Sequence, residues 1–134
     1  MTKQGFGAKA LVLAVLMVLF GCMDKTSEQQ AIDTVMESFN GLLEGDYEAF
    51  LDGRADMDCI PESYREQLLV AYKQFVYQQR EAHGDIISIA PVRTQTDTVA
   101  HQMLVFMAIN YADSTKEEFV VPMIKDSDGL WKMK

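Results

Sequence analysis

The spacing of apolar residues changes once along this chain, near residue 86, and that change restricts the fold more than any other feature. Before it, apolar residues recur every three or four positions, which is the period of an amphipathic helix; they are Ile32, Val35, Met36, Phe39, Leu42 and Leu43. After it, apolar and polar residues alternate, which is the period of a strand. Helices followed by strands predict an α+β domain with N-terminal helices packed on a curved antiparallel sheet.

Capping residues indicate three helices. The first starts near residue 28, with Ser27 as its cap, and ends at Gly45. The second is short and is capped by Asp46. The third covers roughly residues 61–83, because Pro61 suits a first helical position and Gly84 is a natural stop.

Four strands are predicted after the helices, at residues 86–92, 98–112, 117–124 and 130–134. The second is apolar on both faces, so we expect it in the centre of the sheet. Pro91 and Pro122 cannot donate to a ladder and predict bulges or edges. In the last strand we expect Trp131 to be buried against the helices, near Phe39 or Phe75.

An uncharged apolar run at residues 10–20 precedes this domain. As a helix it would be about 16 Å long, against a hydrocarbon core of about 30 Å, so it is too short to span a bilayer comfortably. Lys3 and Lys9 precede the run and Gly21 follows it. A positive start, a short apolar core and a small residue are typical of a secretory signal.

The residues that end this run are Leu19, Phe20, Gly21 and Cys22. They resemble the bacterial lipobox, in which a cysteine receives lipid and becomes the new N-terminus. The resemblance implies a signal peptide at 1–21, a lipidated Cys22 with a tether at 22–27, and a domain at 28–134. It also implies several acyl chains, such as palmitate, which stable anchoring requires.

The same resemblance implies an address in the bacterial cell envelope. Met23, rather than an aspartate, follows the cysteine, and by the usual sorting rule this favours the outer membrane. An ordinary signal peptide that ends near a cysteine is the alternative.

The mature chain is strongly acidic. Without Lys3 and Lys9, 10 basic residues remain against 20 acidic ones, a formal charge of −10. Affinity for nucleic acid depends on Lys and Arg neutralising phosphates, so nucleic acid is not an expected partner. An anionic membrane surface should also repel the domain, so the membrane partner is reached through the lipid on Cys22.

Few residues offer redox or metal chemistry. With Cys22 lipidated, Cys59 has no partner for an internal disulfide. We expect Cys59 to be a small buried hydrophobe, with an intermolecular disulfide or a reactive thiol as alternatives. His83 and His101 lie far apart and no metal-binding spacing is present, so neither a metal nor a cofactor is predicted.

The order of the elements carries a second resemblance. The phrase "EGDYEAF" after the first helix, a long third helix and a final "DSDGLWKMK" resemble the nuclear transport factor 2-like superfamily. Its cone-shaped, cystatin-like sheet encloses a hydrophobic cavity. Small bacterial lipoproteins of unknown function carry such domains, described as lumazine-binding-like. The superfamily mixes isomerases, dehydratases and non-catalytic binding modules, so the fold does not fix the function.

Five side chains are candidates for a site. His101 would face the cavity from the long strand, and Asp56 and Asp58 could form a carboxylate pair; a structural histidine and a solvated loop are the alternatives. Tyr64 and Tyr72 lie on the third helix and could line a ligand pocket, although tyrosine at this spacing is usually core packing.

Two classes of function remain after these observations. The preferred one is a lipid-anchored, non-catalytic module that binds a small apolar ligand or an envelope protein and can form a homodimer through its sheet face. The alternative is a small isomerase or hydratase that uses His101 or an aspartate.

Overall fold

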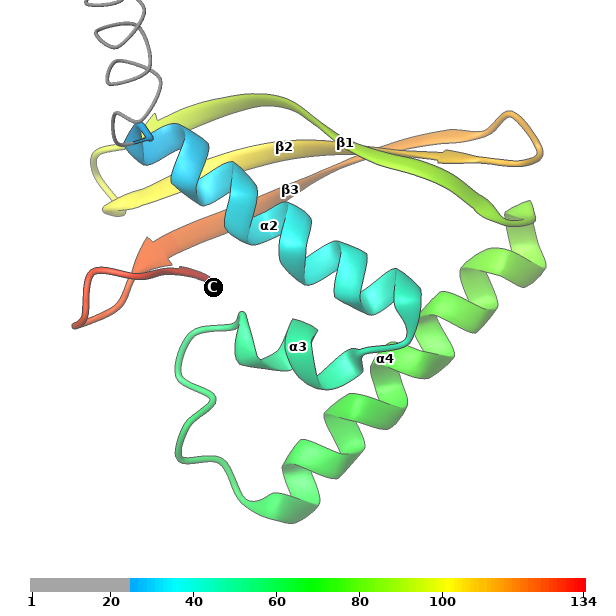
Figure 1. The fold of residues 1–134 in the computed structure, drawn as a ribbon, viewed down its shortest axis with the longest axis horizontal. Coiled ribbons are helices and arrows are strands. Elements are labelled where there is room, and N and C mark those ends of the chain that lie inside the picture. Colours follow the sequence, from blue (N-terminus) through cyan, green and yellow to red (C-terminus); the bar gives the residue numbers. More distant parts are fainter. Residues whose placement is uncertain (1–24) are drawn as a thin grey trace, which may run out of the picture.

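The computed structural model describes residues 25–134. Helices come first and strands afterwards, as the sequence predicts: α2 (Ser27–Glu44), α3 (Tyr47–Asp52), α4 (Glu62–His83), β1 (Ile86–Asp97), β2 (Gln102–Tyr111), β3 (Lys116–Lys125) and β4 (Trp131–Met133). Figure 1 shows the helices gathered on one side of the sheet. Within residues 25–134, no helix is both long and apolar enough to cross a membrane.

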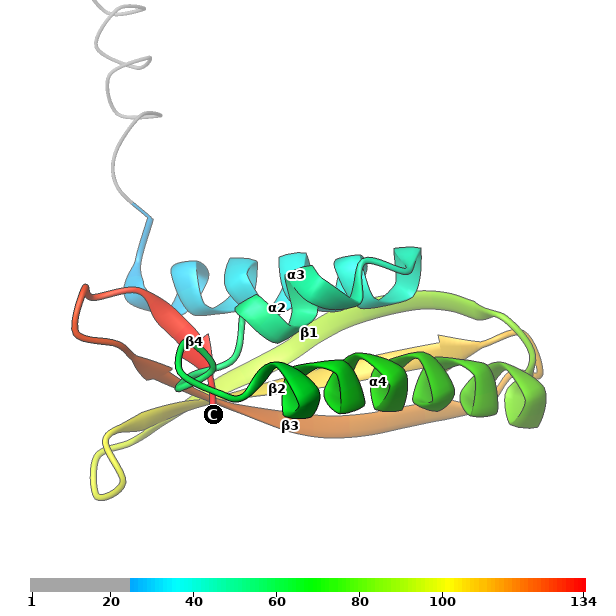
Figure 2. The same ribbon diagram turned by 90° about the horizontal axis from the view of Figure 1, so that it is seen from below.

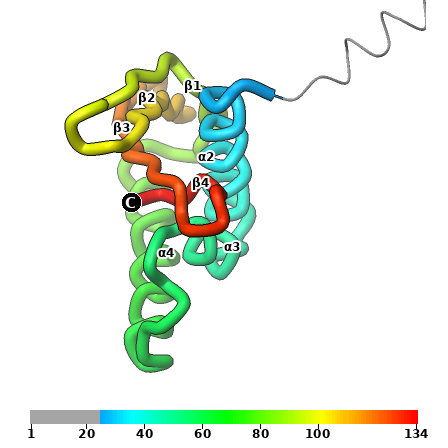
Figure 3. Tube along the Cα trace, turned by 90° about the vertical axis from the view of Figure 1, so that its left-hand side faces the viewer, coloured from blue at the N-terminus to red at the C-terminus, as the bar shows by residue number. Residues whose placement is uncertain are grey.

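The strands form one antiparallel sheet in the order β1-β2-β3-β4, so the predicted central position of β2 is confirmed. The sheet curves around α2, which packs against β1, β2 and β4 (Figure 3). The long helix α4 instead packs against α3 and α2 (Figure 2). A curved sheet with helices on its concave side is therefore the architecture that positions any internal pocket.

The core lies between α2 and the inner face of the sheet. The largest fully buried side chains are Val35, Leu51, Val105, Met107 and Met123. Along β2, alternate residues from Met103 to Tyr111 are buried, which confirms the face that alternation predicts. Burial of these apolar side chains is the main favourable term in the stability of a domain of this size.

The helix ends follow the predicted signals with one shift. The first cap is Thr26 and not Ser27, because the Thr26 hydroxyl accepts a hydrogen bond from the Gln29 amide at 3.2 Å. Gly45 ends α2 with a φ of 89°, a conformation that favours glycine. The Asp46 carboxylate caps α3, as expected, by accepting from the Ala49 amide at 3.1 Å.

The two prolines are accommodated in different ways. Pro91 lies at a bulge on β1, an edge strand, as predicted. The prediction is wrong for Pro122, which lies on the interior strand β3, in the regular ladder with β2, where no bulge occurs. Its carbonyl faces β4 and accepts a hydrogen bond from the Lys134 amide at 2.9 Å. Because β4 ends at this point, the amide hydrogen that proline lacks costs the ladder little.

The outer edge of β4 is covered by the segment that follows α3. The Met133 amide donates to the Gly53 carbonyl at 2.8 Å, and the Met133 carbonyl accepts from the Ala55 amide at 2.7 Å. A parallel bridge joins Arg54 to Met133. An exposed strand edge invites pairing with other chains, so this contact protects the short strand and fixes Arg54 beside the helices.

The start of the second strand and the burial of Cys59 also differ from the expectations. The second strand begins at Gln102 rather than at residue 98, because residues 98–101 form the turn after β1; His101 has a φ of 53° there. Turn geometry overrides the apolar alternation that extended the strand. Cys59 is exposed in the loop between α3 and α4 instead of being buried.

Trp131 packs against the core. The expectation that it lies near Phe39 or Phe75 is wrong. It pairs with Lys125 across β3 and β4 and lies beside the middle of α2, in a recess that Thr34 and Ser38 also line. Phe39 instead contacts Phe119, with ring centroids 5.2 Å apart, at the opposite end of β3. The register of a strand as short as β4 cannot be read from three residues, which explains the error.

Candidate functional site

A pocket of about 460 Å³ opens between the helices and the inner face of the sheet; we call it the central pocket. Its walls come from five elements, α2, α3, α4, β2 and β3. The lining side chains are Phe39, Leu42, Phe50, Tyr72, Phe75, Ile109, Glu117 and Phe119. Apolar and aromatic lining with a few polar groups is typical of a small-molecule site.

Aromatic contacts hold the walls of the central pocket in place. The Phe39 ring lies edge-on to Phe50 with centroids 5.1 Å apart, and Phe50 lies edge-on to Tyr72 at 4.9 Å. These are the distances and orientations that favour aromatic pairs. Rings from α2, α3 and α4 therefore form a continuous apolar wall.

A cation lies beside one wall of the central pocket. Arg54 Nη1 donates a hydrogen bond to Tyr72 Oη at 2.6 Å, and Tyr72 lines the pocket. Both side chains are partly buried. Within residues 25–134, Arg54 forms no ion pair and Tyr72 Oη has no acceptor for its own hydrogen.

A carboxylate marks another part of the wall. His83 Nε2 lies 3.4 Å from Glu117 Oε1, and His83 Nδ1 lies 3.2 Å from Asp113 Oδ2. Tyr111 Oη donates to Gln79 Oε1 at 3.2 Å and is 3.5 Å from Glu117 Oε2. These contacts join the last turns of α4 to the hairpin between β2 and β3.

Burial and hydrogen bonds are the main causes of two pKa shifts in this cluster. Burial, followed by the charge of Glu117, raises the pKa of Tyr111 above its usual value of 10.0. Hydrogen bonds from Thr115, with a smaller contribution from His83, lower the pKa of Asp113. Tyr111 is therefore a hydrogen-bond donor and Asp113 an anion at neutral pH, which orients the imidazole of His83 between two carboxylates.

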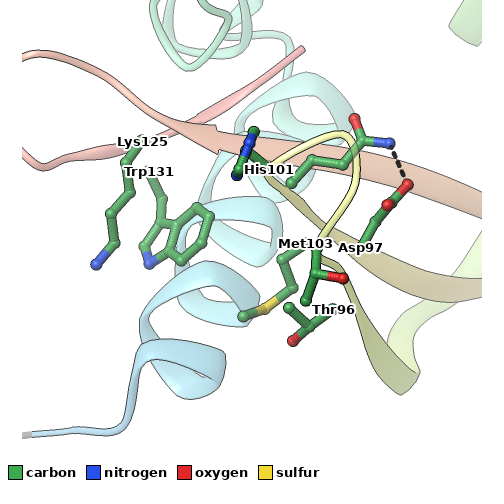
Figure 4. Close-up of a pocket in the computed structure, with 8 residues that line it drawn as sticks. Thr96, Asp97, His101, Met103, Lys125 and Trp131 are labelled. Atoms are coloured by element: carbon green, nitrogen blue, oxygen red, sulfur yellow. Dashed lines mark hydrogen bonds between the residues drawn. The ribbon is translucent and has the colours of Figure 1, made fainter.

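A second recess of about 450 Å³ lies at the other end of the sheet; we call it the hairpin pocket (Figure 4). Its lining side chains are Thr96, Asp97, Thr98, His101, Gln102, Met103, Lys125 and Trp131. Figure 4 shows Trp131 and Lys125 on one side and Thr96 and Met103 on the other. In the described part of the chain, Gln102 Oε1 and Trp131 Nε1 are buried without a hydrogen-bond partner.

Asp97 organises the hairpin pocket. Its carboxylate accepts from the amides of Val99 and Ala100 at 3.1 and 3.0 Å and from Gln102 Nε2 at 3.4 Å. The hydrogen bond from Ala100 is the main reason why the pKa of Asp97 is lowered. The carboxylate therefore stabilises the turn that contains His101.

The structure separates the five side chains that the sequence singles out. Tyr72 lines the central pocket, whereas His101 lines the hairpin pocket. Asp56 and Asp58 are exposed in the loop between α3 and α4, and Tyr64 is exposed on α4. Cys22 lies outside the described residues. No three His, Cys, Asp or Glu side chains within residues 25–134 are grouped as metal ligands would be.

Sequence reasoning missed the polar groups of the central pocket. Arg54 and Glu117 belong to no motif, and the contact of Glu117 with His83 joins residues 34 positions apart in the chain. One signal was present for Glu117: it directly precedes Glu118 in an alternating strand, so one of the two carboxylates had to face inward.

Comparison with known proteins gives a match at the level of structure. No protein-family model and no curated protein matches the sequence. A solved structure from Campylobacter jejuni, described as a candidate NTF2-like transpeptidase, superimposes with a TM-score of 0.58 at 12% sequence identity. The match covers 75% of this chain and 94% of that one. At this identity the likeness concerns the fold alone: the chain has the NTF2-like fold, helices followed by a curved four-stranded antiparallel sheet.

Proposed function

We propose that this chain is a lipid-anchored protein of the bacterial cell envelope whose domain binds a small apolar ligand in the central pocket without chemical conversion. The observation that carries the binding role is the wall of aromatic rings around a pocket of about 460 Å³. A pocket of this size and lining suits a ligand of a few hundred daltons.

Anchoring rests on the residues before the described domain. The lipobox-like sequence that ends at Cys22 supports lipidation, with the outer membrane as the proposed address. Five peptide steps separate Cys22 from the start of α2, a span of at most about 18 Å. The start of α2, the β1–β2 hairpin and the β3–β4 turn lie at one end of the domain (Figure 1), so this end would face the bilayer.

Lipidation is tested on the full-length chain in a bacterial host. We expect the wild-type protein in the membrane fraction, with a mass that shows a diacylglyceryl group on an N-terminal Cys22. Cys22→Ser should abolish the diacylglyceryl modification. An intact Met1, or an unmodified Cys22 at the N-terminus, would refute the anchor.

Ligand binding is tested by a matched pair of substitutions on α4. Phe75 lines the central pocket and is 47% exposed, whereas Tyr77 is 64% exposed and is not part of the lining. A photoactivatable alkyl methyl ester should label the wild-type chain at the tryptic peptides that hold Phe75 and Phe119. Phe75→Glu should reduce this labelling at least tenfold, because the apolar probe would have to displace water from the carboxylate. Tyr77→Glu should leave it unchanged; equal effects of the two would contradict pocket binding.

Catalysis by an isomerase or hydratase is the second candidate. It requires an acid or base in the pocket, but His101, Asp56 and Asp58 lie elsewhere. Glu117 is the carboxylate that lines the central pocket, and it contacts His83 and Tyr111. Exchange of a ligand proton with D₂O solvent that is lost in Glu117→Gln would favour this role over binding.

A homodimer through the outer face of the sheet belongs to the same proposal. Val120 is 45% exposed there, and Phe106 is covered by Arg93, whose guanidinium carbon lies 3.6 Å from the ring centroid. Sedimentation of the full-length chain at several concentrations tests this. A single monomeric species, unchanged by Val120→Lys, would count against the dimer.

A further inference from the structure

The guanidinium of Arg54 is the unusual group beside the central pocket. The chain is acidic, and its other partly buried arginine, Arg65, pairs with Asp52 at 3.2 Å. Arg54 donates instead to a neutral hydroxyl, Tyr72 Oη, at 2.6 Å. A partly buried cation without an anion nearby is unfavourable unless something pairs with it.

Arg54 and Tyr72 lie side by side and both keep unused hydrogen-bond donors. The hydrogen bond between them uses one N–H of Arg54 and a lone pair of Tyr72 Oη, which leaves the hydroxyl hydrogen and the remaining guanidinium hydrogens free within the described part of the chain. A planar oxyanion accepts two such bonds at once, and guanidinium groups recognise carboxylates in this way.

Glu117 makes the electrostatic potential differ between two parts of the central pocket. It belongs to the cluster with Gln79 and His83 on α4, and Gln79 is seven residues beyond Tyr72, about 10 Å along the helix. An anionic group is repelled near Glu117 and attracted near Arg54. The other side chains that line the pocket include Phe39, Phe75 and Phe119, and such a lining suits an alkyl chain and not a charge.

We propose that the ligand of the central pocket is an amphipathic carboxylate of the fatty-acid type, with its head bound by Arg54 and Tyr72 and its tail along the phenylalanine side chains. This inference rests on the proposed ligand-binding function and adds the chemical class of the ligand. The head would complete an ion pair and the tail would fill the apolar volume.

The experiment compares two probes on the full-length chain: a fatty acid with a diazirine in its tail, and its methyl ester. Labelled protein is quantified by intact mass, and the site is mapped on tryptic peptide 117–125, which contains Phe119. We expect the acid to label this peptide at a concentration at least tenfold lower than the ester, because the ester cannot form the ion pair.

Substitutions assign the preference to the two donors. Arg54→Gln should reduce labelling by the acid to the level of the ester and leave the ester unchanged. Tyr72→Phe keeps the ring that contacts Phe50 and should lose part of the preference. The matched control is Arg65→Gln, which removes an arginine that pairs with Asp52 and forms no hydrogen bond with Tyr72, and it should keep the full preference.

The outcomes separate this inference from the proposed function. Equal labelling by acid and ester, or a preference that survives both Arg54→Gln and Tyr72→Phe, would overturn the carboxylate assignment and leave pocket binding intact. Labelling of peptide 117–125 by neither probe would overturn both. Persistent labelling by the ester in Arg54→Gln shows that the variant is folded.

Discussion

Gly53 and Ser38 approach each other so closely that a Cβ atom on Gly53 would clash with the hydroxyl oxygen of Ser38. Met133 Cε would lie 3.3 Å from this added Cβ atom. The φ of Gly53 is −77°, which any residue adopts, so glycine is required here by space and not by backbone conformation. This contact brings the end of α3 onto α2, and Arg54 directly follows the contacting Gly53 in the chain.

We expect Gly53→Ala to lower the free energy of unfolding by about 1–3 kcal/mol, the usual cost of overpacking. The same substitution in a Ser38→Ala background should cost less, because the clashing oxygen is gone. Urea denaturation of the four proteins gives the coupling energy as a double-mutant cycle. An equal cost in both backgrounds would show that Ser38 is not the obstacle.

Trp131, the single tryptophan of the chain, provides a second test. Its Nε1 is buried, but the side chain as a whole is only partly buried. Trp131→Ala should therefore cost about 2 kcal/mol, below the ~3–5 kcal/mol of a fully buried tryptophan. Its emission maximum should lie at shorter wavelength than that of indole in water. Tyr77→Ala, at an exposed position on α4, should change the stability little.

Acid should destabilise the domain through three carboxylates. Asp33, Asp97 and Asp113 have lowered pKa values, chiefly because Lys25, Ala100 and Thr115 respectively donate hydrogen bonds to them. A native pKa below the unfolded value, about 3.9, means that the stabilisation is present above that pH and is lost as the pH falls through the native pKa. The urea midpoint should therefore fall as the pH drops below about 4.

Asp97→Asn should make this fall shallower, because one of the three groups no longer titrates. Asp58→Asn is the matched control, an exposed aspartate whose side chain forms no hydrogen bond within the described residues. An identical pH profile for the wild type and Asp97→Asn would show that the turn does not hold the ionised carboxylate.

The exposed thiol of Cys59 should react with a thiol reagent in the native protein without a lag. A lipidated Cys22 has no free thiol, so the full-length membrane form should show one reactive thiol per chain, and two would contradict lipidation. Cys59→Ser should leave the melting temperature unchanged with and without reductant. A lower melting temperature on reduction would mean that Cys59 forms a disulfide between chains.

The fold could be predicted because its signals are local. Gly45, Asp46 and Gly84 mark helix ends through their own backbone or side-chain chemistry, and alternation in β2 identifies its inner face. The errors come from features that depend on the rest of the molecule. His101 lies in a turn that Asp97 holds, and the position of Trp131 depends on the register of three residues.

The site was harder to predict for the same reason. Tyr72 was found because it lies on an apolar helical stripe. Its partner Arg54 lies in a loop 18 residues earlier, and their contact exists only because α3 and α4 pack together. Pairs of this kind leave no periodic trace in the sequence, so charge and composition alone could not place a cation beside the pocket.

The sparse packing of α4 has a consequence for the hydrogen exchange of its backbone amides. Only Val76 is buried in this 22-residue helix, whereas the strands beside it hold most of the core. A helix held by so little apolar contact opens at a fraction of the free energy that unfolds the sheet. Its amides should therefore exchange with deuterium well before those of β2, and one side of the central pocket can detach while the remainder of the domain stays folded.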